Sequence, residues 1–146
     1  MKITKSACAS WSGGIKTGGG TISTESEALA ETPYGFRQRF EGDKGTNPEE
    51  LAGAALAGCF TMALSKTLED AGSVATRLET KAQVTLEKTG DGFSITSIHL
   101  TLQGQVPGLD RARFRELAQK AKDGCPVSKL YKGTTITLEA MLETSV

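Results

Sequence analysis

The stretch NPEELAGAALAGCFTMALS, residues 47–65, carries the strongest structural signal in the sequence. Asn47 is a favourable helix N-cap, and Pro48 suits the first helical position because no amide hydrogen is needed there. Glu50 falls where it completes a capping box. We therefore expect a helix that begins at the proline and runs to about Ala71, with a length of about 36 Å.

This predicted helix is unusual because residues 51–65 carry no charged side chain. The uncharged stretch is shorter than the roughly 20 residues needed to span a bilayer, and no second one is present, so we expect no membrane partner. A helix that is apolar all round must be covered on every side, which one small sheet cannot do. We therefore expect a homodimer with this helix at its centre, where Gly53 and Gly58 would allow a second backbone to approach closely.

Length and composition limit the class of protein. The chain has 146 residues, and we expect a single domain over residues 1–146. Its 17 lysines and arginines balance 17 aspartates and glutamates, so we expect no nucleic-acid partner. Three scattered cysteines without a CxxC pair exclude a secreted disulfide framework. Because the N-terminus has no signal-peptide pattern, we expect a cytoplasmic protein.

The remaining pattern predicts an α+β fold with largely antiparallel sheet. A change in the apolar phase near Thr96 indicates a bulge in one strand. Asp110 is expected to cap a second helix that ends at Gly124, and a short third helix is expected from Cys125-Pro126. Alternation of apolar and polar residues predicts strands over residues 2–11, 21–24, 34–41, 77–87, 93–103 and 134–142.

Cys59 and Cys125 are the sharpest candidates for chemistry. Cys59 lies among apolar residues, where most cysteines are inert and where burial raises the thiol pKa, so it needs a nearby cation to act as a nucleophile. Arg37 and Arg39, on one face of the strand expected at 34–41, are the candidate cations, and Glu49 or Glu50 could hold one of them. Cys125 precedes a proline-initiated helix, whose amide dipoles favour a thiolate, although a purely structural cysteine fits equally well.

Other chemistries have weaker support. His99 is the only histidine, and no serine-nucleophile motif accompanies it, so we interpret it as a strand residue on a partly exposed face. The cysteines and the histidine lack the short spacings of a zinc site, so we expect no metal. Cys8 lies on the polar face of the first expected strand and has no evident partner.

Four segments together resemble the OsmC branch of the OsmC/Ohr family. The similarity extends over essentially the whole chain, and it implies antiparallel sheets from two subunits that enclose long central helices in an intertwined homodimer. The four segments are RFEG at 39–42, GTNPEEL at 45–51, AGCF at 57–60 and KAKDGCPVS at 120–128.

The resemblance implies a thiol-dependent peroxidase that reduces organic hydroperoxides in oxidative and osmotic stress defence. By the family pattern, Cys59 is the peroxidatic cysteine, Cys125 is the resolving cysteine, and Arg39, paired with Glu49, stabilises the thiolate. This order reverses the pKa ranking that the residues alone favour. A Cys59 sulfenic acid would form a disulfide with Cys125, and an external dithiol, in this family a lipoyl-bearing protein, would reopen it. No cofactor is needed.

Apolar residues near these positions suggest how a substrate would be selected. Phe36, Phe60 and Met62 are candidates for contact with an alkyl or aryl hydroperoxide, although each also suits a core. A hypothesis from another class is a dimeric stress protein that binds a hydrophobic small molecule and uses its cysteines as redox sensors. A structural dimer without chemistry is a third.

Overall fold

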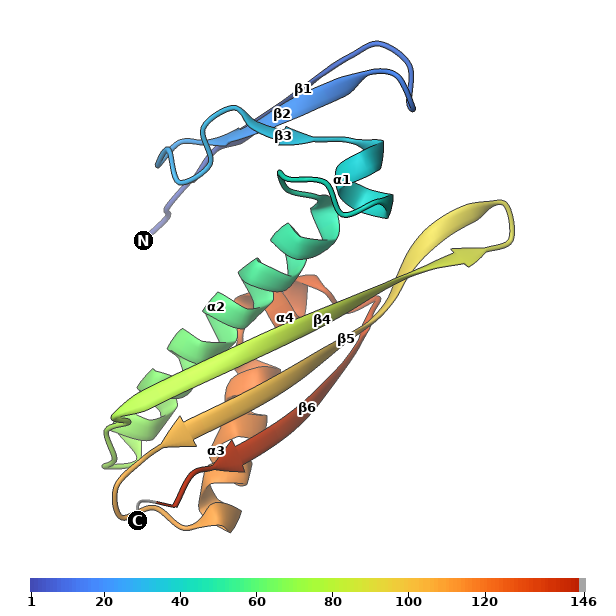
Figure 1. The fold of residues 1–146 in the computed structure, drawn as a ribbon. Coiled ribbons are helices and arrows are strands. Elements are labelled where there is room, and N and C mark those ends of the chain that lie inside the picture. Colours follow the sequence, from blue (N-terminus) through green and yellow to red (C-terminus); the bar gives the residue numbers. More distant parts are fainter. Residues whose placement is uncertain (145–146) are drawn as a thin grey trace. The chain divides into compact units, whose positions relative to one another are not determined.

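The structure is a computed structural model that describes residues 1–144. Contacts divide the chain into two compact units, Met1–Leu51 and Ala52–Val146. Each unit contains one three-stranded sheet, and the fold is α+β, as the sequence predicts (Figure 1). The long helix α2 (Pro48–Asp70) begins in the first unit and continues in the second.

The first unit is built on an antiparallel sheet. Its strands, β1 (Ala7–Ser12), β2 (Gly19–Thr24) and β3 (Thr32–Tyr34), pair in sequence order. Among residues 1–51, all of which the structure describes, only the polar residues Thr46 and Glu49 are buried. No apolar side chain of this sheet is therefore fully buried within the described chain.

The strand expected over residues 34–41 is wrong, because the short helix α1 (Phe36–Phe40) occupies most of this segment. Aromatic and polar residues here also fit a helical repeat of four. The two aromatic rings of α1 lie 4.8 Å apart, and Arg37 Nε lies 3.2 Å from Glu41 Oε2. Residues two apart in a helix point to opposite sides, so Arg37 and Arg39 do not share a face.

Helix α2 begins as the sequence predicts. Asn47 Oδ1 accepts a hydrogen bond from the backbone N–H of Glu50 at 2.8 Å, which confirms the N-cap. The helix ends at Asp70, one residue before the expected end. Gly72 then adopts a φ of 87°, the left-handed conformation that glycine supplies at helix ends.

Only part of α2 is covered in the single chain. On the other side Ala54, Gly58 and Met62 are exposed, and Met62 retains 75% of its surface. By length and composition α2 also resembles a membrane-spanning helix, with a mean hydropathy of 1.4 over 18 residues and 28% of that window buried. Core helices of soluble proteins meet the same criteria. The fully buried residues recur at every fourth position: Leu56, Phe60, Leu64 and Leu68.

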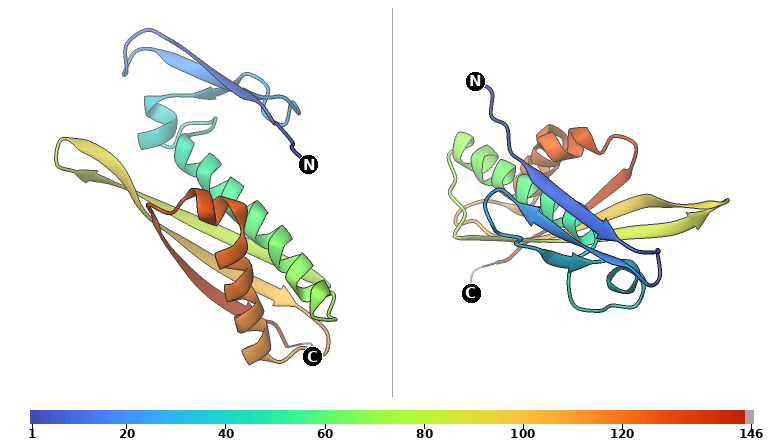
Figure 2. Two further views of the ribbon diagram at one scale, coloured as in Figure 1. Left: turned by 180° about the vertical axis from the view of Figure 1, so that it is seen from behind. Right: turned by 90° about the horizontal axis from the view of Figure 1, so that it is seen from above.

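The second unit packs helices on one face of its sheet (Figure 2). Strands β4 (Arg77–Thr89) and β5 (Gly92–Gln105) form an antiparallel hairpin. Helices α3 (Arg111–Gly124) and α4 (Pro126–Leu130) then lead to β6 (Thr135–Leu142), which pairs with β5 in parallel. The parallel pairing departs from a wholly antiparallel sheet, because a connection through helices carries the chain back across the sheet before the last strand begins.

The expected bulge in β5 is confirmed. Thr85 pairs with Ser97 and Leu86 pairs with Ile95, so Thr96 has no opposite residue. After this shift, alternate residues of β5 point toward the helices, and α3 presents the apolar stripe that the sequence predicts. The resulting core contains Ile98, Leu100 and Leu102 from β5 and Phe114, Leu117, Ala118 and Ala121 from α3.

We expect Gly104→Ala to lower the free energy of unfolding by about 1–3 kcal/mol. An added Cβ would lie 2.6 Å from Cζ and 2.9 Å from Cε2 of Phe114, whose side chain is fully buried. Gly92→Ala, in the same strand, is the matched control, because its Cβ would meet nothing within 4 Å. Its effect should stay within about 0.5 kcal/mol. Urea denaturation measures both, and equal values would contradict the packing of β5 on α3.

Candidate functional site

Cys59 and Cys125 come together within the second unit. Cys59 lies in the middle of α2, and Cys125 lies between α3 and α4. Cys125 is fully buried, Cys59 is partly buried, and both are free thiols. Their side chains lie close enough that each thiol shifts the pKa of the other. Two cysteines in such contact are candidates for a disulfide that forms without a large movement of the backbone.

The start of α4 fixes the position of Cys125. Its backbone N–H donates to the carbonyl of Ala121 at 3.0 Å, and its own carbonyl accepts from the N–H of Lys129 at 3.1 Å. Pro126 then occupies the first position of α4, as expected. At the other end of α4, Tyr131 Oη donates to the carbonyl oxygen of Ala52 at 3.1 Å. This bond joins α4 to α2, the helix that bears Cys59.

The pKa values of the two thiols move in opposite directions. Burial raises the pKa of Cys59, and the Cys125 thiol raises it further, although the backbone N–H of Val127 acts in the opposite sense. Burial also acts to raise the pKa of Cys125. The Cys59 thiol, Ser128 and the backbone N–H of Val127 all favour the thiolate and outweigh burial, so the pKa of Cys125 is lowered. Within this unit, Cys125 is therefore the more readily ionised thiol, as the residues alone favour.

Cys59 needs a cation if it is to be the attacking thiolate. In the described part of the chain, none of the groups that shift the pKa of Cys59 is a cation. A thiol whose pKa is raised by burial has a small thiolate fraction at neutral pH. An attacking role for Cys59 would therefore require a positive charge that is not among these groups.

Arg39 and Glu49 form a bidentate ion pair within the first unit. Arg39 Nε lies 3.0 and 3.2 Å from the two carboxylate oxygens of Glu49, and Nη2 lies 2.5 Å from Oε1. The Glu49 side chain is only 12% exposed, which strengthens such a pair. Glu49 rather than Glu50 thus holds the arginine. Arg37 instead pairs at the surface with Glu41 and Asp43.

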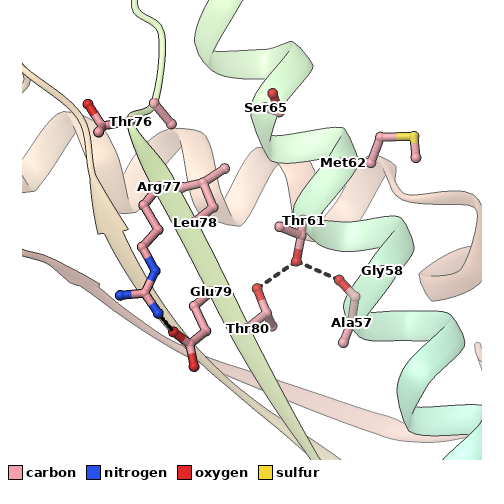
Figure 3. A pocket seen from close by; sticks show the side chains of 11 residues that line it. Ala57, Gly58, Thr61, Met62, Ser65, Thr76, Arg77, Leu78, Glu79 and Thr80 are labelled. Carbon is pink, nitrogen blue, oxygen red and sulfur yellow. Dashed lines mark hydrogen bonds and ion pairs between the residues drawn. The ribbon is translucent and has the colours of Figure 1, made fainter.

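The three aromatic and apolar candidates lie in different surroundings. Phe36 is a partly exposed residue of α1, beside Phe40. Phe60 is fully buried in the core of the second unit. Met62 is exposed on α2 and lines a groove of about 720 Å³ between α2 and β4 (Figure 3). Cys59 is not among the residues that line this groove.

A hydroxyl pair crosses the groove between α2 and β4. Thr61 Oγ1 lies 2.6 Å from the carbonyl oxygen of Ala57 and 2.7 Å from Thr80 Oγ1 (Figure 3). These bonds attach the helical turn after Cys59 to the sheet. They therefore help to hold this part of α2, which bears Cys59, against β4, without contact to the Cys59 sulfur.

Sequence reasoning missed the groups that surround Cys125. The backbone N–H of Val127 lowers the pKa of both thiols, and Ser128 lowers the pKa of Cys125. Tyr131 and its bond to α2 were missed as well. Their position in the sequence could have identified them, because all three residues lie within two helical turns after the Cys-Pro pair.

The remaining candidates stay apart from this pair of thiols. Cys8 is an exposed residue of β1 in the first unit. His99 lies on β5 with 41% of its side chain exposed, where Nδ1 contacts Thr137 Oγ1 at 2.5 Å. The partly exposed strand position of His99 is thus confirmed. Residues 1–144 contain no group of three or more metal-binding side chains.

Comparison with known proteins identifies the family. A family model described as OsmC-like protein matches residues 41–139, a segment that contains Glu49 and both thiols of the pair and begins two residues after Arg39. Peroxiredoxin OsmC of Escherichia coli (strain K12) is 53% identical over 143 residues, which cover 98% of this chain and 99% of that protein.

More distant relatives agree. Organic hydroperoxide resistance protein OhrB of Bacillus subtilis is 33% identical over 94 residues, which cover 64% of this chain and 67% of that protein. The crystal structure of OhrB superposes with a TM-score of 0.67 at 30% identity and covers 94% of this chain and 98% of that one. The chain therefore belongs to the OsmC-like protein family.

Proposed function

We propose that this chain is a thiol-dependent peroxidase that reduces organic hydroperoxides to alcohols. The contact between the Cys59 and Cys125 thiols carries the proposal, because a two-cysteine peroxidase needs a second thiol within reach of the first. The 53% identity to a peroxiredoxin and the likeness to organic hydroperoxide resistance proteins support this activity and a role in stress defence.

The reaction balances with these two thiols and one external dithiol. The Cys59 thiolate attacks the distal peroxide oxygen, the O–O bond breaks, and the alkoxide leaves and takes up a proton to give the alcohol. Cys59 is then a sulfenic acid. The Cys125 sulfur attacks the Cys59 sulfur, the S–O bond breaks, and water leaves as the disulfide forms. The dithiol returns two electrons and two protons, and we propose that a lipoyl-bearing protein in the cytoplasm supplies it.

We propose that Arg39 provides the cation that Cys59 needs. The ion pair with Glu49 uses Nε and Nη2 of the guanidinium, and Nη1 makes no hydrogen bond to any described residue. The carboxylate therefore orients the guanidinium and leaves one donor group for another partner. A guanidinium beside Cys59 would lower the pKa of that thiol and stabilise the departing alkoxide.

We also propose that two chains form the working unit. The uncharged face of α2 with Ala54, Gly58 and Met62, and a first unit without a buried apolar residue, both leave apolar surface that a second chain would cover. Phe36 and Met62 keep enough exposed surface to contact a hydroperoxide, and Phe60 would shape the site from the core.

Cys59→Ser should reduce peroxide consumption to the uncatalysed rate, because a serine hydroxyl is not ionised at neutral pH and cannot form a sulfenic acid. The assay follows cumene hydroperoxide in the presence of dithiothreitol. Cys8→Ser is the matched control and should keep full activity, since Cys8 lies exposed in the first unit. Full activity of Cys59→Ser would refute the mechanism and favour a binding or sensing role.

Arg39→Lys should lower the rate at pH 7 about tenfold and move the pH–rate profile upward, because lysine cannot make the bidentate pair that orients the cation. The profile moves to higher pH because the thiolate loses a stabilising charge, and this loss raises the pKa of Cys59. Arg37→Lys should leave the profile unchanged, since Arg37 pairs with Glu41 and Asp43 at the surface. Identical profiles for the two variants would exclude Arg39 as the cation.

Sedimentation equilibrium should give twice the chain mass of 15.4 kDa. Met62→Lys should shift the equilibrium toward single chains, because it places a charge on the exposed apolar face of α2. Val74→Lys adds the same charge at an apolar residue that is 68% exposed outside α2, and it should leave the mass unchanged. A folded single chain in the unmodified protein would contradict the dimer.

A further inference from the structure

Ser128 has a buried hydroxyl that the proposed mechanism does not use. Among the side chains of residues 1–144, its Oγ is the one buried nitrogen or oxygen atom that lacks a hydrogen bond of ordinary geometry. Burying a hydroxyl in this way is unfavourable unless the group gains a partner in some state of the protein. The surroundings of Ser128 identify that partner.

The Cys125 sulfur is the polar group that position on the first turn of α4 brings nearest to the Ser128 hydroxyl. Ser128 follows Cys125 by three residues on the first turn of α4, and its side chain and its backbone N–H both act on that sulfur. Serine in a helix often bonds the carbonyl one turn back, but this hydroxyl makes no such bond. A thiol is a weak hydrogen-bond acceptor, whereas a thiolate is a strong one. The hydroxyl therefore gains a full partner only when Cys125 is ionised.

The exposure of the two sulfurs shows when Cys125 must carry a charge. Cys59 is partly exposed and Cys125 is fully buried, so an external thiolate can reach the disulfide only at the Cys59 sulfur. Its attack forms a mixed disulfide with Cys59, the S–S bond breaks, and Cys125 leaves with the electron pair as a thiolate. A better-stabilised thiolate leaves faster. The same thiolate attacks Cys59 when the disulfide forms.

We propose that Ser128 is a positioning residue whose hydroxyl donates a hydrogen bond to the Cys125 thiolate, and that it thereby sets the rates at which the Cys59–Cys125 disulfide forms and is reduced. This inference deepens the proposed peroxidase function and rests on it. The step of peroxide attack at Cys59 does not involve Ser128. The two disulfide steps and the peroxide step should therefore respond differently to its removal.

A test of the Ser128 hydroxyl must leave the other titratable groups around it unchanged. Cys59 faces Cys125 from α2, and Lys122 and Asp123 of α3 lie 3.8 Å apart. Lys122 and Asp123 line a small cavity together with Ser128. Three more titratable side chains line the same cavity, from α4 and the turn after it: Lys129, Tyr131 and Lys132. A change at Ser128 alone leaves all of these groups in place. A difference between the unmodified protein and a Ser128 variant is therefore due to the hydroxyl.

The first measurement isolates Cys125. In a Cys8→Ser, Cys59→Ser background, Cys125 is the single thiol, and ultraviolet absorbance follows its ionisation with pH. Adding Ser128→Ala should move the titration to higher pH, because the thiolate loses a donor. Ser128→Thr keeps a hydroxyl and should stay near the parent. Superimposable titrations of the serine and alanine proteins would overturn the proposal.

The second measurement uses the chain with all its cysteines, in single turnovers. Ser128→Ala should leave peroxide consumption by reduced Cys59 unchanged, and should slow both disulfide formation and its reduction by dithiothreitol about tenfold. Ser128→Thr should restore both rates. Equal slowing of all three steps, or of the peroxide step alone, would overturn the positioning role. If the unmodified protein consumes no peroxide, the peroxidase proposal fails, while the titration still tests the Ser128 contact independently.

Discussion

The contact between a thiol in the middle of α2 and a thiol at the start of α4 is the constraint on which the rest of the second unit depends. It requires α2 to cross the sheet without interruption, and the residues at every fourth position that pack on the core hold it there. It also requires α3 to end where Cys125 can turn toward α2. The Cys-Pro pair provides that end, because proline starts a new helix in a new direction. Tyr131 then attaches α4 to α2 beyond the sulfurs.

The thiols and the candidate cation lie in different parts of the chain, and this separation has a physical reason. Burial beside Cys125 makes Cys59 a weak acid, and the uncharged helix around it holds no cation. A charged side chain within residues 51–65 would have to be desolvated on a covered helix, which is costly. In the first unit, the ion pair with Glu49 fixes the orientation of the Arg39 guanidinium. The proposed mechanism thus separates the cation from the thiols in sequence and places each in the surroundings that it tolerates.

Local rules in the sequence were sufficient for most elements. The cap at Asn47, the cap at Asp110, the bulge at Thr96 and the stripe on α3 all follow from residue chemistry at short range, and the structure contains them. Segment 34–41 was assigned wrongly because a five-residue pattern of aromatic and polar side chains fits both a strand and one helical turn. The contact of Cys59 with Cys125 and the role of Ser128 could not be predicted from spacing, since they depend on how elements far apart in the chain pack together. The residues alone leave the partner of Arg39 open between Glu49 and Glu50, the family resemblance implies Glu49, and the structure contains that pair.

The distance in sequence between Cys59 and Cys125 links their contact to the order in which the chain folds. Contacts between residues far apart in the chain form late, because a long loop must close first. The segment between Cys59 and Cys125 includes β4, β5 and α3, so the two sulfurs meet only after these elements have condensed. During synthesis, Cys59 leaves the ribosome well before Cys125 and spends that interval without its partner. In the proposed mechanism, a chain that has not finished folding would therefore carry a Cys59 without its resolving partner, and oxidation at that stage would lead to irreversible sulfinic and sulfonic acids rather than to a reducible disulfide.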